Sequence, residues 1–158
     1  MIVKGSYILV LQIQQAIDDL QIGRLGRFSF PAGYYLYVGS AFGAGGLRAR
    51  LSHHERREKA RPHWHIDYLR AHAIIHEAWV VGCPVRLESR WCAALAHELT
   101  VSIPVAGFGS SDSHCPAHLF FTPRPPHPSF LCRIILADLI CDGPAEIQIE
   151  VQRFDTPA

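Results

Sequence analysis

The sequence of 158 residues has no long hydrophobic run and no recognisable export signal. Its longest apolar stretches, residues 8–13 and 131–140, fall well short of the ~20 residues that a membrane-spanning helix needs. The N-terminus leads directly into a strand-like run, without the basic segment, apolar block and small-residue cleavage site of a signal peptide. We therefore expect a non-membrane protein that is located in the cytoplasm.

The sequence also lacks the cysteine pattern of a disulfide-stabilised secreted domain. It holds five cysteines, an odd number, spread from Cys83 to Cys141. Reduced thiols are the expected state.

Net charge is nearly absent, at +1, so the chain as a whole gives no argument for a polyanionic partner. Six of the 15 Lys and Arg residues nevertheless lie within residues 48–61. A local basic patch of this kind can attract phosphate groups even when the average charge cannot. The ten histidines are a large share for this length, and several are candidates for chemistry or phosphate contact because they titrate near neutral pH.

About half of the residues are apolar, which is enough for one hydrophobic core, and the chain is too short for two full domains. Hydrophobic periodicity separates strand-like from helix-like segments. Strands are expected over residues 5–13, 23–30, 34–39 and 76–81, and helices over 47–59, 62–73 and 85–99. The expected class is α+β, with a small antiparallel or mixed sheet flanked by helices.

Prolines set the C-terminal part apart from the rest. Residues 122–128 contain four prolines, which remove backbone donors and fix the backbone, so we expect a linker there after a core domain of residues 1–121. Beyond it, residues 132–140 and 145–154 alternate around Asp142-Gly143-Pro144, which predicts a β-hairpin within an extension of residues 129–158. A lone hairpin is marginally stable in water, so it should pack on the domain or on a partner chain.

Short motifs appear in a fixed order along the predicted core domain. They are Gly5-Ser6-Tyr7, then Tyr37-Val38-Gly39, then Arg50 and His54. This order resembles the signature of the GIY-YIG nucleases. Longer stretches at residues 33–41, 63–69 and 107–112 resemble a branch of that superfamily that is sometimes fused to endonuclease-III-type DNA glycosylases. The resemblance covers about residues 3–121, and it implies the nuclease fold and phosphodiester hydrolysis with one divalent metal ion.

The resemblance also implies a role for each matched residue. Tyr37 or Tyr7 would orient or deprotonate the attacking water, and Arg50 would bind the scissile phosphate. His54, one helical turn after Arg50, would support the same contact. A glutamate on a helix would hold a single Mg²⁺ or Mn²⁺, because these ions suit carboxylate and water ligands.

Two glutamates of the helix predicted over residues 85–99 compete for the metal. Glu98 lies nearer the centre of the apolar stripe. In the related branch, however, a glutamate precedes a tryptophan by three residues, as Glu88 precedes Trp91 here. We take Glu88 as the ligand and keep Glu98 as the alternative. As a first-turn acid, Glu88 could also serve only to complement the helix dipole.

Further basic residues are expected to contact the substrate: Arg48, Arg56, Arg57 and His63. A three-ligand metal site at His63, His65 and Asp67 is not expected, because on a helix His65 points away from the other two.

Cys115 and His118 could contribute to a zinc site, but a fourth thiolate is not evident. The related branch often has cysteine where this sequence has Ser89 and Ser113, so a structural loop is the favoured interpretation.

Three functions remain open. The first is a structure-selective DNA endonuclease linked to repair or recombination, because so small a domain has little surface for reading a long sequence. The second is a non-catalytic nucleic-acid-binding module with the same fold. The third is an interaction domain that forms a homodimer through the edges of the C-terminal hairpin. DNA is favoured over RNA as the partner, and a DNA-repair protein is a further expected partner.

Overall fold

The computed structural model describes residues 1–110, 114–137 and 147–154. Its centre is a five-stranded sheet in the order β6-β4-β1-β5-β7, in which every neighbouring pair is antiparallel. The strands are β1 (Gly5–Ile13), β4 (Gly33–Ala41), β5 (Ile74–Gly82), β6 (Leu119–Thr122) and β7 (Ile149–Arg153). A small second sheet pairs β2 (Ile17–Ile22) with β3 (Gly26–Phe30). The predicted α+β class is confirmed.

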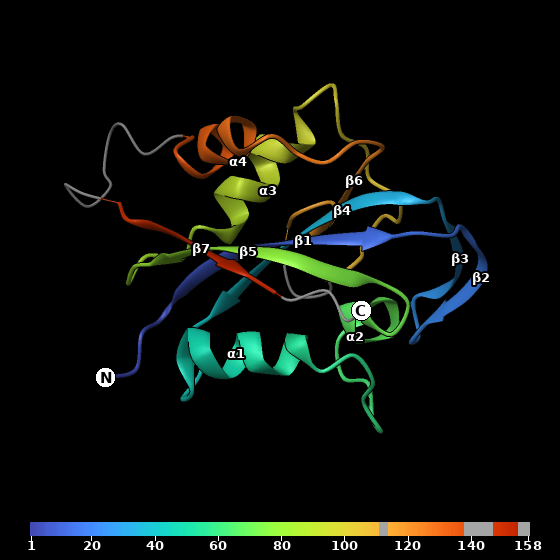
Figure 1. The fold of residues 1–158 in the computed structure, drawn as a ribbon, viewed down its shortest axis with the longest axis horizontal. Helices are drawn as coiled ribbons and strands as arrows, with labels where there is room; N and C mark the ends of the chain where they lie inside the picture. Colours follow the sequence, from blue (N-terminus) through green and yellow to red (C-terminus); the bar gives the residue numbers. More distant parts are fainter. Residues whose placement is uncertain (111–113, 138–146, 155–158) are drawn as a thin grey trace.

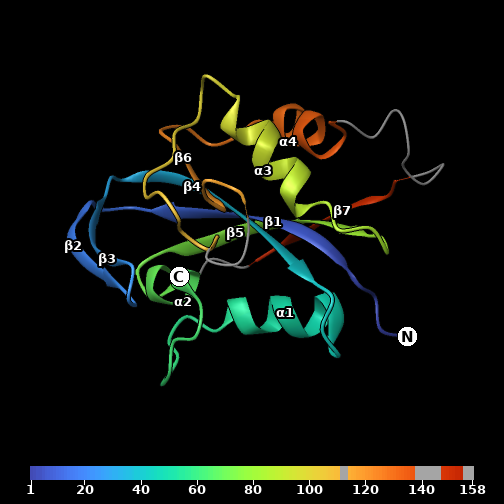
Figure 2. The same cartoon turned by 180° about the vertical axis from the view of Figure 1, so that it is seen from behind.

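Helices cover both faces of the central sheet. They are α1 (Gly46–Glu55) and α2 (His65–Arg70) on one face, and α3 (Glu88–Ala96) and α4 (Pro128–Ile135) on the other (Figure 1, and from behind in Figure 2). Successive side chains of a strand point to opposite faces, so β1 supplies Tyr7 and Leu9 to one core cluster and Ile8 and Val10 to the other. This two-sided burial explains why β1 is apolar along most of its length.

The register between β1 and β4 places two tyrosines side by side. Tyr7 lies opposite Gly39, and Leu9 lies opposite Tyr37. Tyr7 and Tyr37 are therefore diagonal neighbours on the same face, and both belong to the core cluster on the side of α1 and α2.

Strand β6 pairs with only part of β4. It covers residues 34–37, with Leu119 opposite Tyr37. The backbone N–H of Val38 still donates to the carbonyl of His118, at 2.9 Å. Gly39 and Ser40 lie beyond this pairing, at an edge of the sheet.

The predicted C-terminal hairpin is wrong in its first arm, which the structure replaces with α4. Pro128 stands in the first turn of this helix, and His127 Nδ1 accepts a hydrogen bond from the Ser129 backbone at 3.1 Å. The buried residues of α4 are Leu131, Ile134 and Ile135, spaced at i, i+3 and i+4. That spacing is helical and was mistaken for alternation.

Strand β7 falls within the predicted second arm, but it pairs with β5. The predicted turn at residues 142–144 lies outside the described residues. Strand β7 forms one edge of the central sheet, and the homodimer through edges of the C-terminal segment stays a prediction.

Two helices are shorter than predicted because side chains cap their ends. The carboxylate of Asp67 accepts the backbone N–H groups of His63 and Trp64 at 2.8 and 2.9 Å, so α2 begins at His65. The buried guanidinium of Arg70 donates to the carbonyls of His54 and Glu55, where α1 ends. Among the described residues, no helix is both long and apolar enough to cross a bilayer.

If α4 is part of the hydrophobic core, shortening one of its buried side chains should destabilise the whole domain. Ile134 is 1% exposed, so Ile134→Ala is expected to lower the free energy of unfolding by about 2–4 kcal/mol. Leu136, two residues later and 47% exposed, is the matched control, and Leu136→Ala should cost about 0.5 kcal/mol or less. Urea unfolding of both variants measures the difference. Equal losses would show that α4 does not pack as described.

Candidate active site

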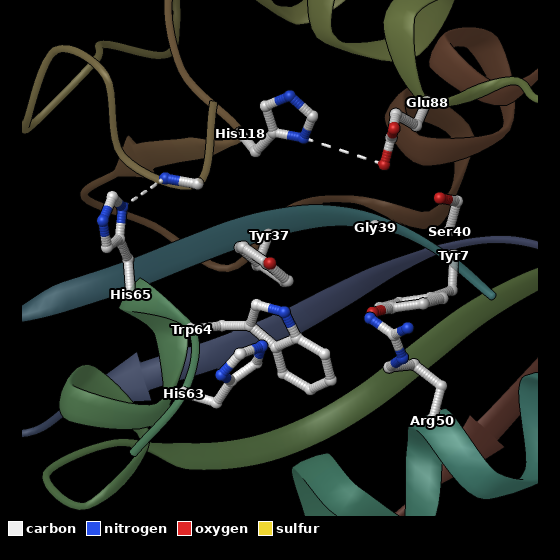
Figure 3. Close-up of a pocket in the computed structure, with 11 residues that line it drawn as sticks. Tyr7, Tyr37, Gly39, Ser40, Arg50, His63, Trp64, His65, Glu88 and His118 are labelled. Atoms are coloured by element: carbon white, nitrogen blue, oxygen red, sulfur yellow. Dashed lines mark hydrogen bonds and ion pairs between the residues drawn. The ribbon is translucent and has the colours of Figure 1, made fainter. Parts of the chain in front are cut away.

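A pocket of about 320 Å³ opens where β1, β4, α1, the start of α2, α3 and the segment before β6 meet (Figure 3). It is lined by Tyr7, Tyr37, Gly39, Ser40, Arg50, His63, Trp64, His65, Glu88, Gly109 and His118. Of the residues predicted as catalytic, Tyr7, Tyr37, Arg50 and Glu88 are brought together here.

The pocket wraps around the edge of β4. Glu88 and His118 lie on one side of this strand, whereas Tyr37 and Arg50 lie on the other (Figure 3). Side chains from both faces of the sheet can meet because β6 pairs with residues 34–37 and leaves Gly39 and Ser40 at the edge. The incomplete pairing of β4 is therefore what opens the pocket.

Tyr7 is held by a buried histidine. Its hydroxyl lies 2.7 Å from His54 Nε2, and both residues are 1% exposed. In α1, Leu47, Leu51 and His54 are buried at helical spacing, which turns His54 toward the sheet. His54 does not line the pocket, so it does not share a phosphate with Arg50 as the sequence suggested; it lies behind Tyr7.

Burial changes the ionisation of this pair. Burial lowers the pKa of His54 to about 3, with smaller contributions from the neighbouring His53, Lys59 and Arg50. The second ring nitrogen of His54, Nδ1, is buried without a hydrogen-bond partner among the described residues, so a proton added there would be poorly solvated. Burial also raises the pKa of Tyr7 and of Tyr37. At neutral pH the histidine is neutral and both phenols are protonated.

Arg50 lies over an aromatic ring. Its guanidinium carbon is 4.2 Å from the centroid of Trp64, a cation–π contact that fixes the plane of the guanidinium at the pocket wall. Trp64 falls within a stretch that carried the family resemblance, but no role in the site was predicted for it. The signal that was missed is its place directly before α2, three residues ahead of Asp67, whose carboxylate accepts its backbone N–H.

Asp67 anchors the segment that carries His63 and Trp64. Besides their two backbone N–H groups, its carboxylate contacts His53 Nε2 at 3.0 Å and Lys59 Nζ at 3.2 Å. Burial alone would raise the pKa of Asp67, but these hydrogen bonds together lower it. Asp67 is thus a structural anion that holds the start of α2 in place.

Glu88 and Glu98 are separated by the length of α3. Glu88 opens the helix and lies in the pocket, with Oε2 3.8 Å from His118 Nδ1. Glu98 follows the other end of the helix and forms an ion pair with Arg133. The structure therefore places Glu88, and not Glu98, beside the two tyrosines.

Of the four residues predicted to bind substrate, one lies in the pocket and three lie outside it. His63 lines the pocket, but the three arginines lie outside it. Arg57 donates to the carbonyl of Ala71, Arg56 lies beside His53, and Arg48 borders a separate hollow between α1 and the β5–β7 edge. Sequence reasoning missed Ser40 and Gly109 as pocket residues, and it gave His65 no role there; His65 Nδ1 accepts from the Gly109 backbone at 2.8 Å.

Comparison with known proteins gives one family. A family model described as Domain of unknown function DUF123 matches residues 6–140. No curated protein and no solved structure gives a significant match.

The buried histidine makes stability depend on pH. The ordinary pKa of an unfolded histidine is about 6.5, so between about pH 6.5 and the folded value of about 3 only the unfolded chain carries a proton on His54. The free energy of unfolding is therefore unaffected by His54 above about pH 6.5. Below that pH it falls by up to ~1.4 kcal/mol per pH unit, because only the unfolded chain takes up the proton. His54→Gln should flatten this dependence in urea unfolding at about pH 7, 6 and 5. The exposed His72 is the control, and the prediction fails if His72→Gln and His54→Gln behave alike.

Gly39 leaves room for Tyr7, which gives a steric test of the pocket. A Cβ at Gly39 would lie 2.4 Å from Cζ and Oη of the buried Tyr7 ring, whereas a Cβ at Gly43 meets nothing within 4 Å. Gly39→Ala should therefore cost about 1–3 kcal/mol in the free energy of unfolding. Gly43→Ala should leave it within about 0.5 kcal/mol of the parent. Chemical denaturation measures both, and a neutral Gly39→Ala would contradict the register given for β1 and β4.

Proposed function

The chain belongs to the DUF123 family, and we propose that it is a divalent-metal-dependent endonuclease that hydrolyses phosphodiester bonds in DNA. One observation carries the proposal: Tyr7, Tyr37, Arg50 and Glu88 come from four different elements and line one pocket. They are the residues that the resemblance to GIY-YIG nucleases assigned to the reaction.

Arg50 supplies the phosphate contact. Its guanidinium is permanently charged and can donate two parallel hydrogen bonds to phosphate oxygens. The five N–H donors lie in the plane of the guanidinium, and stacking on Trp64 fixes the orientation of that plane. Such a preorganised cation stabilises negative charge that develops on phosphorus oxygens during hydrolysis.

The two tyrosines supply hydroxyl groups for the attacking water. Both phenols are neutral at pH 7, so they orient the water by hydrogen bonding. The Tyr7 hydroxyl lies 2.7 Å from His54 Nε2, and the low pKa of His54 keeps that ring neutral. His54 therefore fixes the direction of the Tyr7 hydroxyl by hydrogen bonding and does not take up its proton. This arrangement favours Tyr7 as a residue that orients the attacking water.

Glu88 is the residue that would hold the metal ion. Mg²⁺ and Mn²⁺ are often bound by one or two carboxylates together with water and substrate phosphate, and the side chain of Glu88 is 23% exposed within the pocket. A bound ion would neutralise charge on the scissile phosphate. The donor set therefore fits the proposed cofactor.

The substrate is proposed to be branched or damaged DNA encountered in the cytoplasm during repair or recombination. Phosphate contacts carry no sequence information, and so small a domain has little surface for reading a long sequence. The arginines outside the pocket, Arg48, Arg56 and Arg57, could add phosphate affinity farther along the strand. A DNA-repair protein that delivers the chain to such sites is the corresponding partner.

Substitution of the pocket residues tests the reaction. Tyr7→Phe, Arg50→Ala and Glu88→Gln should each reduce cleavage of labelled flap, fork or four-way-junction DNA by about 100-fold or more, because each removes a group that acts on the transition state. The assay uses Mg²⁺ or Mn²⁺ and a parallel series with chelator, in which cleavage should stop.

Glu98→Gln is the matched control, since Glu98 is an equivalent carboxylate that pairs with Arg133 outside the pocket. It should cleave within about twofold of the parent if its loss has only a surface effect. Binding measured in the same samples separates the alternatives. Binding without cleavage under every condition would show that the chain is a nucleic-acid-binding module and not an endonuclease. Loss of cleavage in Glu98→Gln alone would identify Glu98, and not Glu88, as the metal ligand.

A further inference from the structure

We propose that Cys92, Cys115 and His118 bind a zinc ion behind the pocket. One ligand atom from each of these residues lies within 4.8 Å of the others, and no other such group occurs among the described residues. Two thiolates and an imidazole are a donor set that selects Zn²⁺ over the hard ions Mg²⁺ and Mn²⁺. This site is separate from the metal at Glu88 and does not depend on the endonuclease proposal.

Helix packing and backbone hydrogen bonds bring the three residues together. Cys92 is fully buried on the face of α3 that packs against the sheet. Cys115 and His118 lie three residues apart at the end of a loop that is closed by two backbone hydrogen bonds. These run from Gly107 N to Pro116 O and from His118 N to Phe108 O, both at 2.8 Å. Little ordering remains to be done when the ion binds, which favours affinity.

The hydrogen bonding of His118 suits a metal ligand. Its Nδ1 lies 3.2 Å from the carbonyl of Val38, and a carbonyl only accepts, so Nδ1 carries the proton. In the neutral ring the lone pair is then on Nε2, which points away from Glu88 (Figure 3). A ligating histidine usually donates its other N–H to a carbonyl or carboxylate, and here Nδ1 faces both Val38 and Glu88.

Charge balance also favours the site. Binding releases one proton from each thiol, so the two thiolates neutralise the two charges of Zn²⁺ and a neutral unit is buried. Three protein ligands leave one of the four tetrahedral positions for water.

The ion would join the two segments that form one wall of the pocket. Glu88 and Cys92 are four residues apart on the same side of α3, and His118 itself lines the pocket. Zinc bound at Cys92, Cys115 and His118 would therefore fix the position of Glu88 relative to His118.

Metal titration of the full chain under reducing conditions tests the proposal. The purified protein should contain one zinc per chain by elemental mass spectrometry, and Co²⁺ added to metal-free protein should give the intense thiolate-to-cobalt charge-transfer band of a tetrahedral site. Loss of an outer-shell partner already costs about 10–100-fold in affinity, so Cys115→Ser should weaken Co²⁺ binding by about 100-fold or more. Cys132→Ser, which changes a partly buried cysteine outside the cluster, should bind as the parent does.

Thermal unfolding gives a second readout that does not depend on cleavage of DNA. A zinc chelator should lower the Tm of the parent and of Cys132→Ser and leave the Tm of Cys115→Ser unchanged. Cys115 is partly exposed, so its substitution disturbs the fold less than substitution of the buried Cys92 would. Absence of the charge-transfer band in the parent, parent-like Co²⁺ affinity in Cys115→Ser, or a Cys92–Cys115 disulfide in freshly reduced protein would overturn the site.

Discussion

The backbone register between β1 and β4 is the constraint on which the pocket depends. It sets Tyr7 opposite Gly39 and turns Tyr7 and Tyr37 to the same face. A slip of one residue between these strands would leave Tyr7 and Tyr37 on opposite faces of the sheet. The register is protected because β1 is buried on both faces, so any slip would exchange two well-packed sets of side chains at once.

The sequence predicted much of this framework because the signals are local. Apolar runs marked β1 and β5, and the order of the short motifs brought forward Tyr7, Tyr37, Arg50 and His54, of which the first three line the pocket. The resemblance to the related branch added Glu88, which lines it as well. Their chemical roles stay predictions. The choice of Glu88 over Glu98 as a pocket residue depended on its distance from Trp91, a spacing that a one-dimensional pattern can carry.

What the sequence could not provide depends on tertiary contacts. The burial of His54 behind Tyr7 follows from the way α1 lies on the sheet, and nothing in its neighbourhood distinguishes it from the exposed His72. Cys92 lies near Cys115 and His118 because α3 packs beside the segment that precedes β6, a contact that no local pattern in the sequence indicates. The α4 error had a different cause, since a short apolar segment fits either period until its Pro128 start is taken as a helix signal.

Strand β6 begins only at Leu119, opposite Tyr37, and this leaves backbone groups of β4 unpaired by β6 at the pocket. Backbone groups of alternate residues in an antiparallel strand point to the same edge, and those of Val38 point to His118 and β6. The N–H and carbonyl of Ser40, two residues on, therefore point to the side where β6 no longer pairs, and Ser40 lines the pocket. A main-chain donor at this place is common to every amino acid except proline. Alanine scanning cannot detect its contribution, and sequence divergence at position 40 need not alter it.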